Sequence, residues 1–290
     1  NNGRLCMENG TLSEKAYWNE RTSTGRLADT YWDDMPENSV GTKEVSSLFD
    51  GKVVFSNPKP IEYLSRMLKA QTSSENEDYI LDFFSGSASL AHAIIKLNAE
   101  DGGNRKFIMV QLPEKCDEKS EAYKAGYKNI CEIGKERIRR AGKKIKEENP
   151  TVTDLDIGFR VLKLDSSNMK DVYYKPADTD QNFLTKFENN IKEDRTPLDL
   201  LFQVMLEFDT PLSAKIDEKE VAGKKVFVVG DNDLIACFDE NVTDEVVKTI
   251  AQMKPNYAVF RDNSFPKDSV AVNFDQIFAT YSPTTTRKVL

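Results

Sequence analysis

The chain has 290 residues, of which 39% are hydrophobic and 30% charged. This length allows a sizeable core, and the composition predicts a globular protein with two domains. It has no run of about 18 apolar residues and no basic-then-apolar leader, so we expect a cytoplasmic protein without a membrane segment. The net charge of −8 is a weak argument against a protein that binds nucleic acid by itself. Four widely spaced cysteines and a single histidine predict free thiols and no metal site. Because the first residue is Asn rather than Met, we expect a piece of a longer protein.

The first 50 residues are polar and irregular, as in the tail of a domain. From Gly51 onward, apolar residues recur at the spacings of strands and helices. The elements expected in this part are a strand at 52–56, a helix at 61–71, a strand at 79–84, a helix at 90–98, a strand at 106–112, a helix from about 120 to 146 and a strand at 159–165. Strand, helix and strand at these lengths predict a βαβ unit with a parallel sheet.

The last part of the chain has a separate pattern, which predicts a small α/β domain. Its expected elements are a helix at 196–208, strands at 224–231 and 234–239 joined by a turn, a helix at 244–254, a strand at 257–262 and a helix at 272–281. The polar stretch at 175–190 is the expected boundary between the two domains.

The most informative segment is YILDFFSGSASL, residues 79–90. Its strand breaks into Gly and Ser just before a helix, which leaves backbone N–H groups free and directs the positive end of the helix dipole toward the turn. Ligands of open α/β sheets bind outside the carboxyl ends of strands, so residues 85–89 are the expected ligand site. The turn has one glycine, Gly86, and no lysine after it, which disfavours a dinucleotide or a triphosphate. Asp82 can accept from an ammonium group and Phe84 can stack on an adenine, so the site suits an adenosine that carries an amino acid.

Two neighbouring positions have ordinary structural interpretations. Phe83 alternates with Phe84 along the strand, so one of these two rings is expected to be buried. His92 lies one helical turn beyond the expected ligand site and is expected to be a packing or capping residue.

A strongly basic segment at residues 135–146 contains seven basic residues and one acidic residue. Its apolar residues recur at helical spacing, so one face is expected to pack inward and the basic side chains to point outward. Two interpretations stay open, a solvated helix face or a contact with a phosphate backbone or an acidic partner. The candidates for a nucleic-acid contact are Arg137, Arg139, Arg140, Lys143 and Lys144.

Several motifs together resemble the modification subunits of type III restriction–modification systems. They are FSNPKP at 55–60, YILDFFSGSASLAHAIIKLNAEDGGNRKFIMVQLPE at 79–114, and then GFRVLKLDSSN, LIACFD and VFRDNSFPKDS. The likeness runs from about Thr30 to the end and keeps the family's order. It implies a DNA methyltransferase of the beta class, which transfers a methyl group from S-adenosylmethionine to the exocyclic amine of a flipped adenine.

In that class the catalytic half comes first, then the target-recognition region, then the cofactor-binding half. The resemblance therefore implies that residues 1–50 end the target-recognition or linker region. Residues 51–174 would be the cofactor-binding half, with a partial Rossmann-like sheet, and residues 175–290 a smaller α/β (α+β) assembly domain. The family's Asp-Pro-Pro-Tyr catalytic motif does not occur in these residues, so no catalytic residue is assigned and the chain is expected to be inactive alone.

The implied partners are DNA, reached through the full-length protein, and the restriction subunit, with a second copy of the chain as an option. The alternative function is a non-catalytic module that dimerises or docks the restriction subunit. A nicotinamide-dependent oxidoreductase is disfavoured because the glycine fingerprint of that class is missing.

The resemblance also assigns cofactor contacts. Asp82 would lie near the methionine ammonium and Phe84 against the cofactor. The residues that would bring the backbone close to the ligand are Gly86, Ser87 and Ser89. The family usually has a second glycine where this chain has Ala88, so a methyl group is expected beside the ligand, on a residue that suits turns with negative φ.

Three other segments would complete the cofactor site. Pro58 and Lys59 would border the methionine carboxylate. Either Gln111, at a strand end, or Glu114 would hold the ribose hydroxyls, and the choice between these two residues stays open. Asp165 would approach the adenine amine, with an ordinary polar turn as the alternative.

Overall fold

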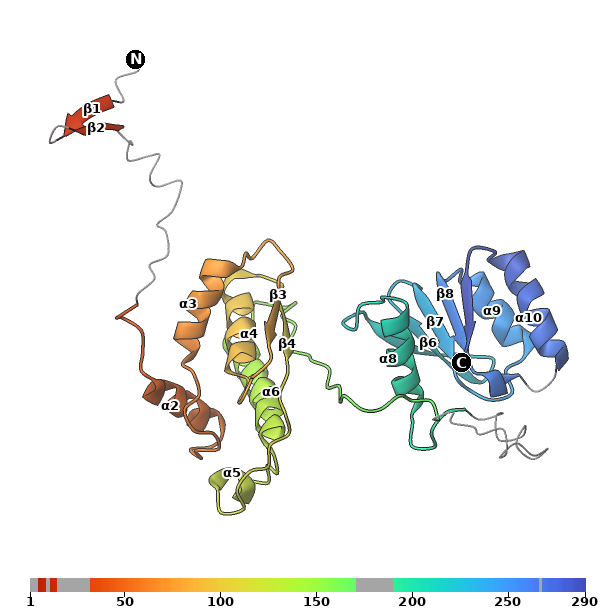
Figure 1. Cartoon of the computed structure of the whole chain (residues 1–290), viewed down its shortest axis with the longest axis horizontal. Helices are drawn as coiled ribbons and strands as arrows, with labels where there is room; N and C mark the ends of the chain where they lie inside the picture. The colour runs from red at the N-terminus through yellow and green to blue at the C-terminus, as the bar shows by residue number, and fades with distance from the viewer. Residues whose placement is uncertain (1–4, 9–10, 15–31, 171–189, 266–267) are drawn as a thin grey trace, which may run out of the picture. The chain divides into compact units, whose positions relative to one another are not determined.

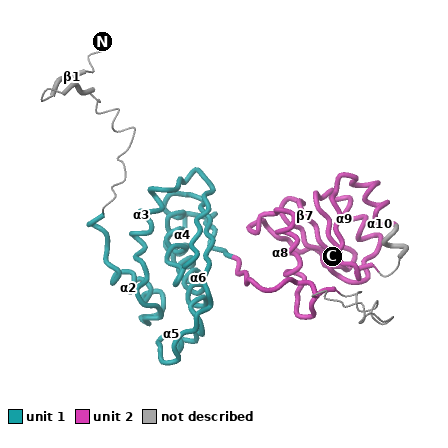
Figure 2. Tube along the Cα trace, in the orientation of Figure 1, with its two compact units in different colours: residues 1–159 teal, residues 160–290 magenta. Residues whose placement is uncertain are grey.

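The computed structural model describes residues 5–8, 11–14, 32–170, 190–265 and 268–290. The chain divides into two compact units, residues 1–159 and residues 160–290, and each is described by itself (Figure 2). The domain boundary that we expect between residues 174 and 175 lies outside the described residues. None of the helices in the described ranges is long and apolar enough to cross a membrane.

Unit 1, residues 1–159, contains a hairpin, a two-stranded sheet and a group of helices (Figure 1). Its elements are β1 Leu5–Glu8, β2 Thr11–Glu14, α2 Asn38–Leu48, α3 Ile61–Gln71, β3 Tyr79–Asp82, α4 Ser89–Asp101, β4 Lys106–Met109, α5 Glu121–Lys124 and α6 Ile130–Glu148. Strands β3 and β4 pair in parallel, with Leu81 opposite Ile108, and α4 connects them. The predicted βαβ unit is therefore confirmed.

Helix α4 is the centre of unit 1. It packs against α3 on one side and α6 on the other, and its residues Ile94, Ile95 and Leu97 are buried. Phe107 and Met109 of β4 pack against the same two clusters, so one face of the sheet is covered by helices. The helix ends at Gly102, whose φ of 71° is the left-handed conformation that favours glycine at this position.

The opposite face of this sheet is apolar but uncovered in the part of the chain that the structure describes. We call it the open face, and it consists of Tyr79, Leu81, Ile108 and Val110, which are 49–57% exposed. Parallel sheets are normally buried on both faces, because exposed apolar strands lose the stabilisation that burial provides. The open face therefore has the composition of an interior surface.

The structure corrects several expected elements in unit 1. Residues 52–56 and residues 159–165 have no regular secondary structure, because an extended segment becomes a strand only when it pairs with another. The long expected helix is two helices, since Gly126 ends α5 with a φ of 98° and Asn129 caps α6 by accepting from the N–H of Glu132. Helix α2 was not expected, because only three of its residues are buried and no side chain in the described part of the chain caps its start.

Unit 2, residues 160–290, is built on one five-stranded sheet. Its elements are α8 Pro197–Glu207, β5 Ile216–Val221, β6 Lys224–Val229, β7 Leu234–Cys237, α9 Asp244–Gln252, β8 Tyr257–Phe260, the 3-10 turn η2 Asp262–Ser264, α10 Asp268–Tyr281 and β9 Thr286–Val289. The strand order is β5-β6-β7-β8-β9, with the first two pairings antiparallel and the last two parallel. The prediction of a small α/β domain here is confirmed, although edge strands β5 and β9 were not expected.

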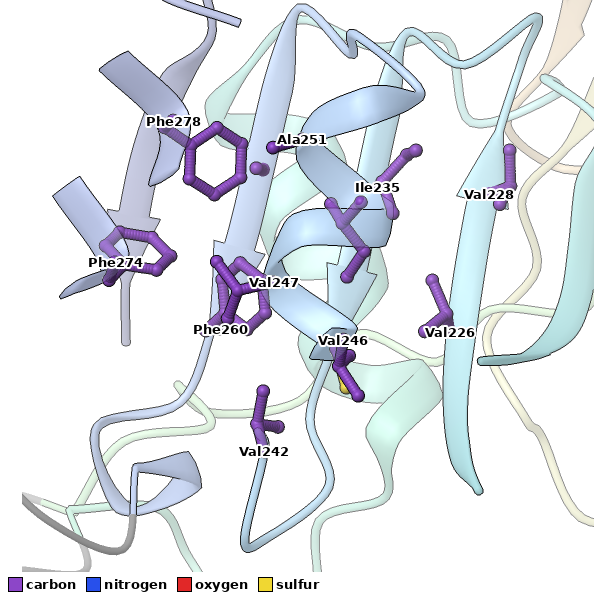
Figure 3. Close-up of a cluster of buried hydrophobic side chains, with 13 residues drawn as sticks. Val226, Val228, Ile235, Val242, Val246, Val247, Ala251, Phe260, Phe274 and Phe278 are labelled. Atoms are coloured by element: carbon purple, nitrogen blue, oxygen red, sulfur yellow. The ribbon is translucent and has the colours of Figure 1, made fainter. Parts of the chain in front are cut away.

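Helices cover both faces of this sheet. On one face α9 and α10 enclose a cluster in which Phe274 meets Phe260 and Phe278 edge to face, with ring centroids 5.2 and 5.1 Å apart (Figure 3). On the other face α8 packs Leu201 and Met205 against the sheet. Unit 2 therefore has a complete three-layer core, which unit 1 lacks on its open face.

Candidate functional site

The segment that joins β3 to α4 is a tight turn of small residues, and we call residues 85–89 the small-residue turn. It begins where Asp82 accepts from the N–H of Phe84 at 3.1 Å. The N–H of Ser85 donates to the carbonyl of Val110, which fixes the turn to the end of β4. Gly86 has a φ of 52°, which a side chain would make unfavourable. The turn therefore lies at the carboxyl ends of both parallel strands, the edge where α/β proteins bind ligands.

Ala88 is the N-cap residue of α4 and has a φ of 59° and a ψ of 41°. No side chain among the described residues caps the start of α4, so its first N–H groups have no side-chain acceptor and the positive end of its dipole is directed toward the small-residue turn. Alanine was expected here as a residue that suits turns with negative φ, but Ala88 has the left-handed conformation, which costs a non-glycine residue about 1–2 kcal/mol. The expectation that its methyl group lies beside the ligand is wrong, because Ala88 is 2% exposed and packs in the core with α6.

Arg137 lies directly behind the turn. Its Nη1 donates to the hydroxyl of Ser87 at 2.7 Å and to the hydroxyl of Ser89 at 2.6 Å, and all three residues are buried. The prediction that Arg137 faces solvent is wrong. It lies four residues after Ile133 and four before Ala141, on the inward row of α6, and this spacing was the signal that the sequence contained.

The charge of Arg137 has little compensation. Its Nε and Nη2 have no hydrogen-bond partner among the described residues. Burial lowers the pKa of Arg137 to about 10, against the attraction of Glu44, which is close enough to act electrostatically. Burial, with help from Arg137 and Lys96, lowers the pKa of His92 to about 3, so this histidine is neutral and agrees with the packing role expected for it.

Three other segments support the turn. The side chain of Gln111 accepts from the N–H of Gly86 at 2.7 Å, so this residue is engaged with the turn itself. A Cβ at Gly86 would lie 3.1 Å from the ring of Phe55, and one at Gly134 in α6 would lie 3.3 Å from the carbonyl oxygen of Gly86. In α2, a Cβ at Gly41 would overlap the carbonyl oxygen of Pro58. The glycines thus allow α6 to touch the small-residue turn and α2 to touch the loop at Pro58.

The structure brings most of the expected cofactor residues to this edge with different degrees of exposure. Phe83 and Phe84 are 61% and 79% exposed, so the expectation that one ring is buried is wrong, because β3 ends at Asp82 and the alternation ends with it. Lys59 and Glu114 are exposed, whereas Pro58 is buried. Whether Gln111 or Glu114 contacts a ribose stays a prediction.

Asp165 belongs to unit 2, whereas the small-residue turn belongs to unit 1. Its carboxylate accepts from the N–H of Ser166 at 2.7 Å and lies 3.5 Å from Nη2 of Arg195. The hydrogen bond from Ser166 and the charge of Arg195 lower the pKa of this exposed carboxyl. The strand that was expected to carry Asp165 to the ligand is not formed, and its contact with an adenine stays a prediction.

Comparison with known proteins identifies the family. Residues 8–143 match the family described as DNA methylase. This part of the chain belongs to the DNA methylases. The chain is 39% identical over 153 residues to the type III restriction-modification enzyme StyLTI Mod subunit of Salmonella typhimurium, an alignment that covers 53% of this chain and 23% of the relative. It is 36% identical over 126 residues to the EcoPI Mod subunit of Escherichia phage P1, covering 43% of this chain and 18% of that protein.

The EcoP15I Mod subunit of Escherichia coli is 30% identical over 243 residues, covering 79% of this chain and 34% of that protein. This alignment is longer than unit 1, so it extends into unit 2. The resemblance to type III modification subunits is thereby confirmed. The chain spans about a third or less of the length of these curated relatives.

The basic face of unit 1 is formed by α6. The side chains of Arg139, Lys143 and Lys144 are 56%, 78% and 53% exposed. Each has an acidic side chain of the same helix at 3.8–3.9 Å, as expected for a solvated face. Arg140 is only partly exposed and pairs with Glu136 and Asp50 at 2.7 and 2.9 Å, and these hydrogen bonds raise its pKa. A DNA contact by these residues stays a prediction, and Lys143 and Lys144 are its best candidates.

Proposed function

We propose that this chain is the cofactor-binding part of an adenine-N6 DNA methyltransferase of a type III restriction–modification system. The observation that carries the proposal is the uncapped start of α4 behind the small-residue turn, at the carboxyl ends of β3 and β4. Homology to Mod subunits supports the choice of cofactor and of DNA as substrate. S-adenosylmethionine would supply the methyl group.

The residues of the turn fit such a ligand. Asp82 is half-buried at the strand end, where its carboxylate would accept from the methionine ammonium. Phe84 exposes its ring and would stack against the adenine of the cofactor. Gln111 would act by holding Gly86, and the backbone of Ser87 and Ser89 would approach the ligand while their hydroxyls point to the interior.

Transfer to a base needs further groups. The Asp-Pro-Pro-Tyr motif that in the family binds the flipped adenine does not occur in this sequence, so we propose that the chain alone is inactive. The open face supports this division, because it is an apolar sheet surface of the kind that a domain interior covers. The catalytic half of the full-length protein is the proposed occupant of that face.

The test is calorimetric titration of the chain with S-adenosylmethionine. Asp82→Asn removes the charge but keeps an oxygen that can accept from the N–H of Phe84, and we expect it to weaken binding at least about tenfold, the usual effect of losing a charged hydrogen bond. Asp117→Asn is the matched control, because Asp117 accepts from the N–H of Lys119 in the same kind of turn away from the site. Equal affinities for wild type and Asp82→Asn would contradict the assignment.

A second candidate function is an interaction module formed by unit 2. Two observations favour it, the complete three-layer core of unit 2 and the alignment with the EcoP15I Mod subunit that extends into it. The proposed partners are the restriction subunit or a second copy of the chain. Co-purification with the restriction subunit and sedimentation of the chain alone test these partners, and a monomer that retains no restriction subunit would contradict both.

A further inference from the structure

We propose that Arg137 is a positioning residue for the cofactor site, which acts by holding the hydroxyls of Ser87 and Ser89 away from the start of α4. This inference rests on the proposed function, because it assumes that the small-residue turn binds S-adenosylmethionine. Arg137 would not touch the ligand, since it is fully buried behind the turn.

The burial of Arg137 is costly and therefore needs an explanation. A guanidinium loses its hydration on burial, and this cost is offset only when its N–H groups are paired, preferably with a carboxylate. Here Nη1 is paired with two neutral hydroxyls, Nε and Nη2 have no partner among the described residues, and Glu44 acts only through its charge. Simple stabilisation would be achieved more cheaply by an apolar side chain.

The two serines explain what the guanidinium does. Serine hydroxyls are strong caps of helix N-termini, because they accept from the free N–H groups of the first turn. Ser87 and Ser89 flank the N-cap residue of α4, yet neither caps the helix, and both accept from Nη1 instead. Arg137 thus engages the two hydroxyls that would otherwise compete with a ligand for the N–H groups of α4.

The position of Arg137 also ties the turn to a rigid support. It projects from the middle of α6, a helix of 19 residues, and Gly134 one turn earlier lets the same helix approach the carbonyl oxygen of Gly86. Gln111 holds the N–H of Gly86 from the other side. Removing Arg137 would therefore release Ser87 and Ser89, while Ser85 and Gly86 stay held by Val110 and Gln111.

The experiment is a mutant cycle in the full chain, read out as the dissociation constant of S-adenosylmethionine by calorimetry. The variants are Arg137→Met, which keeps the length and apolar contacts of the side chain, the pair Ser87→Ala and Ser89→Ala, and the triple variant. We expect Arg137→Met to weaken binding about tenfold to a hundredfold. The triple variant should bind no more weakly than Arg137→Met, because Arg137 acts through the two hydroxyls that the triple variant lacks.

The matched control is Arg139→Met, which removes an arginine of the same helix from its exposed face. A merely structural role would lower the melting temperature of Arg137→Met and leave the dissociation constant unchanged at temperatures where the variant is folded. That result would overturn the inference, as would losses that add in the triple variant. If Arg137→Met does not fold, the serine pair decides. Without the two hydroxyls nothing competes for the N–H groups of α4, so the pair should bind S-adenosylmethionine about as tightly as the wild type, and a clear loss of affinity in the pair overturns the inference. A wild-type chain that binds no S-adenosylmethionine would overturn the proposed function as well, whereas equal binding by wild type and Arg137→Met overturns only the role of Arg137.

Discussion

Replacing Ala88 by glycine tests the strain in the small-residue turn. The change relieves about 1–2 kcal/mol of left-handed strain. It also removes a buried methyl group, worth about 0.8 kcal/mol, and gives the unfolded chain extra freedom worth about 0.4–1 kcal/mol. Because these contributions nearly cancel, we expect Ala88→Gly to change the free energy of unfolding by less than about 1 kcal/mol.

Ala91 provides the matched control, because it is equally buried, belongs to the same cluster and lies inside α4. Ala91→Gly loses the methyl group and about 1 kcal/mol of helix propensity, so a loss of about 2 kcal/mol is expected. Urea unfolding followed by tryptophan fluorescence reports on unit 1, since Trp18 and Trp32 are the two tryptophans of the chain and both belong to residues 1–159. Equal losses in the two variants would refute the argument from strain.

Three further predictions concern other residues. The folded-state pKa of His92 is about 3, against 6.5 in the unfolded chain, so the unfolded chain binds the proton more readily. The free energy of unfolding is therefore highest above pH 6.5 and falls by roughly 1.4 kcal/mol for each pH unit below it. His92→Gln, which removes the only histidine, should abolish this slope in unfolding experiments between pH 6.5 and 5. Arg105→Met should cost about 2–3 kcal/mol in urea unfolding, because the buried guanidinium pairs with Asp101, whose carboxylate can be partly rehydrated. Lys143→Glu with Lys144→Glu should weaken DNA binding by the full-length protein and reduce its salt slope by up to about 2, and an unchanged slope would leave α6 as a solvated face.

The sequence predicted the features that depend on local order. The turn at residues 85–89 and the βαβ unit follow from the apolar spacing of residues 79–112 and from Gly86, and the structure forms them at these positions. The two strands expected at 52–56 and 159–165 were not predictable in the same way, because pairing depends on a neighbour that the local sequence does not specify.

The errors within the site have a different cause. Arg137 was assigned to the surface from its charge, although its helical phase with Ile133 placed it inside. Whether a basic side chain is buried depends on distant groups, and the two serines that accept from Nη1 of Arg137 lie 48 and 50 residues earlier in the chain. The positive φ of Ala88 is likewise imposed by the packing of α4 against α6, since nothing in the local sequence favours that conformation for alanine.

The open face has a consequence for the life of the protein in the cell. Until the proposed catalytic half packs on it, the chain exposes Leu81, Ile108 and Val110 on an apolar surface of the kind that chaperones bind. The same surface can pair with that of another unassembled chain, which leads to aggregation. The amount of this unit would therefore depend on how much of the part that covers the open face is present. Copies without that part would be degraded by proteases rather than accumulate.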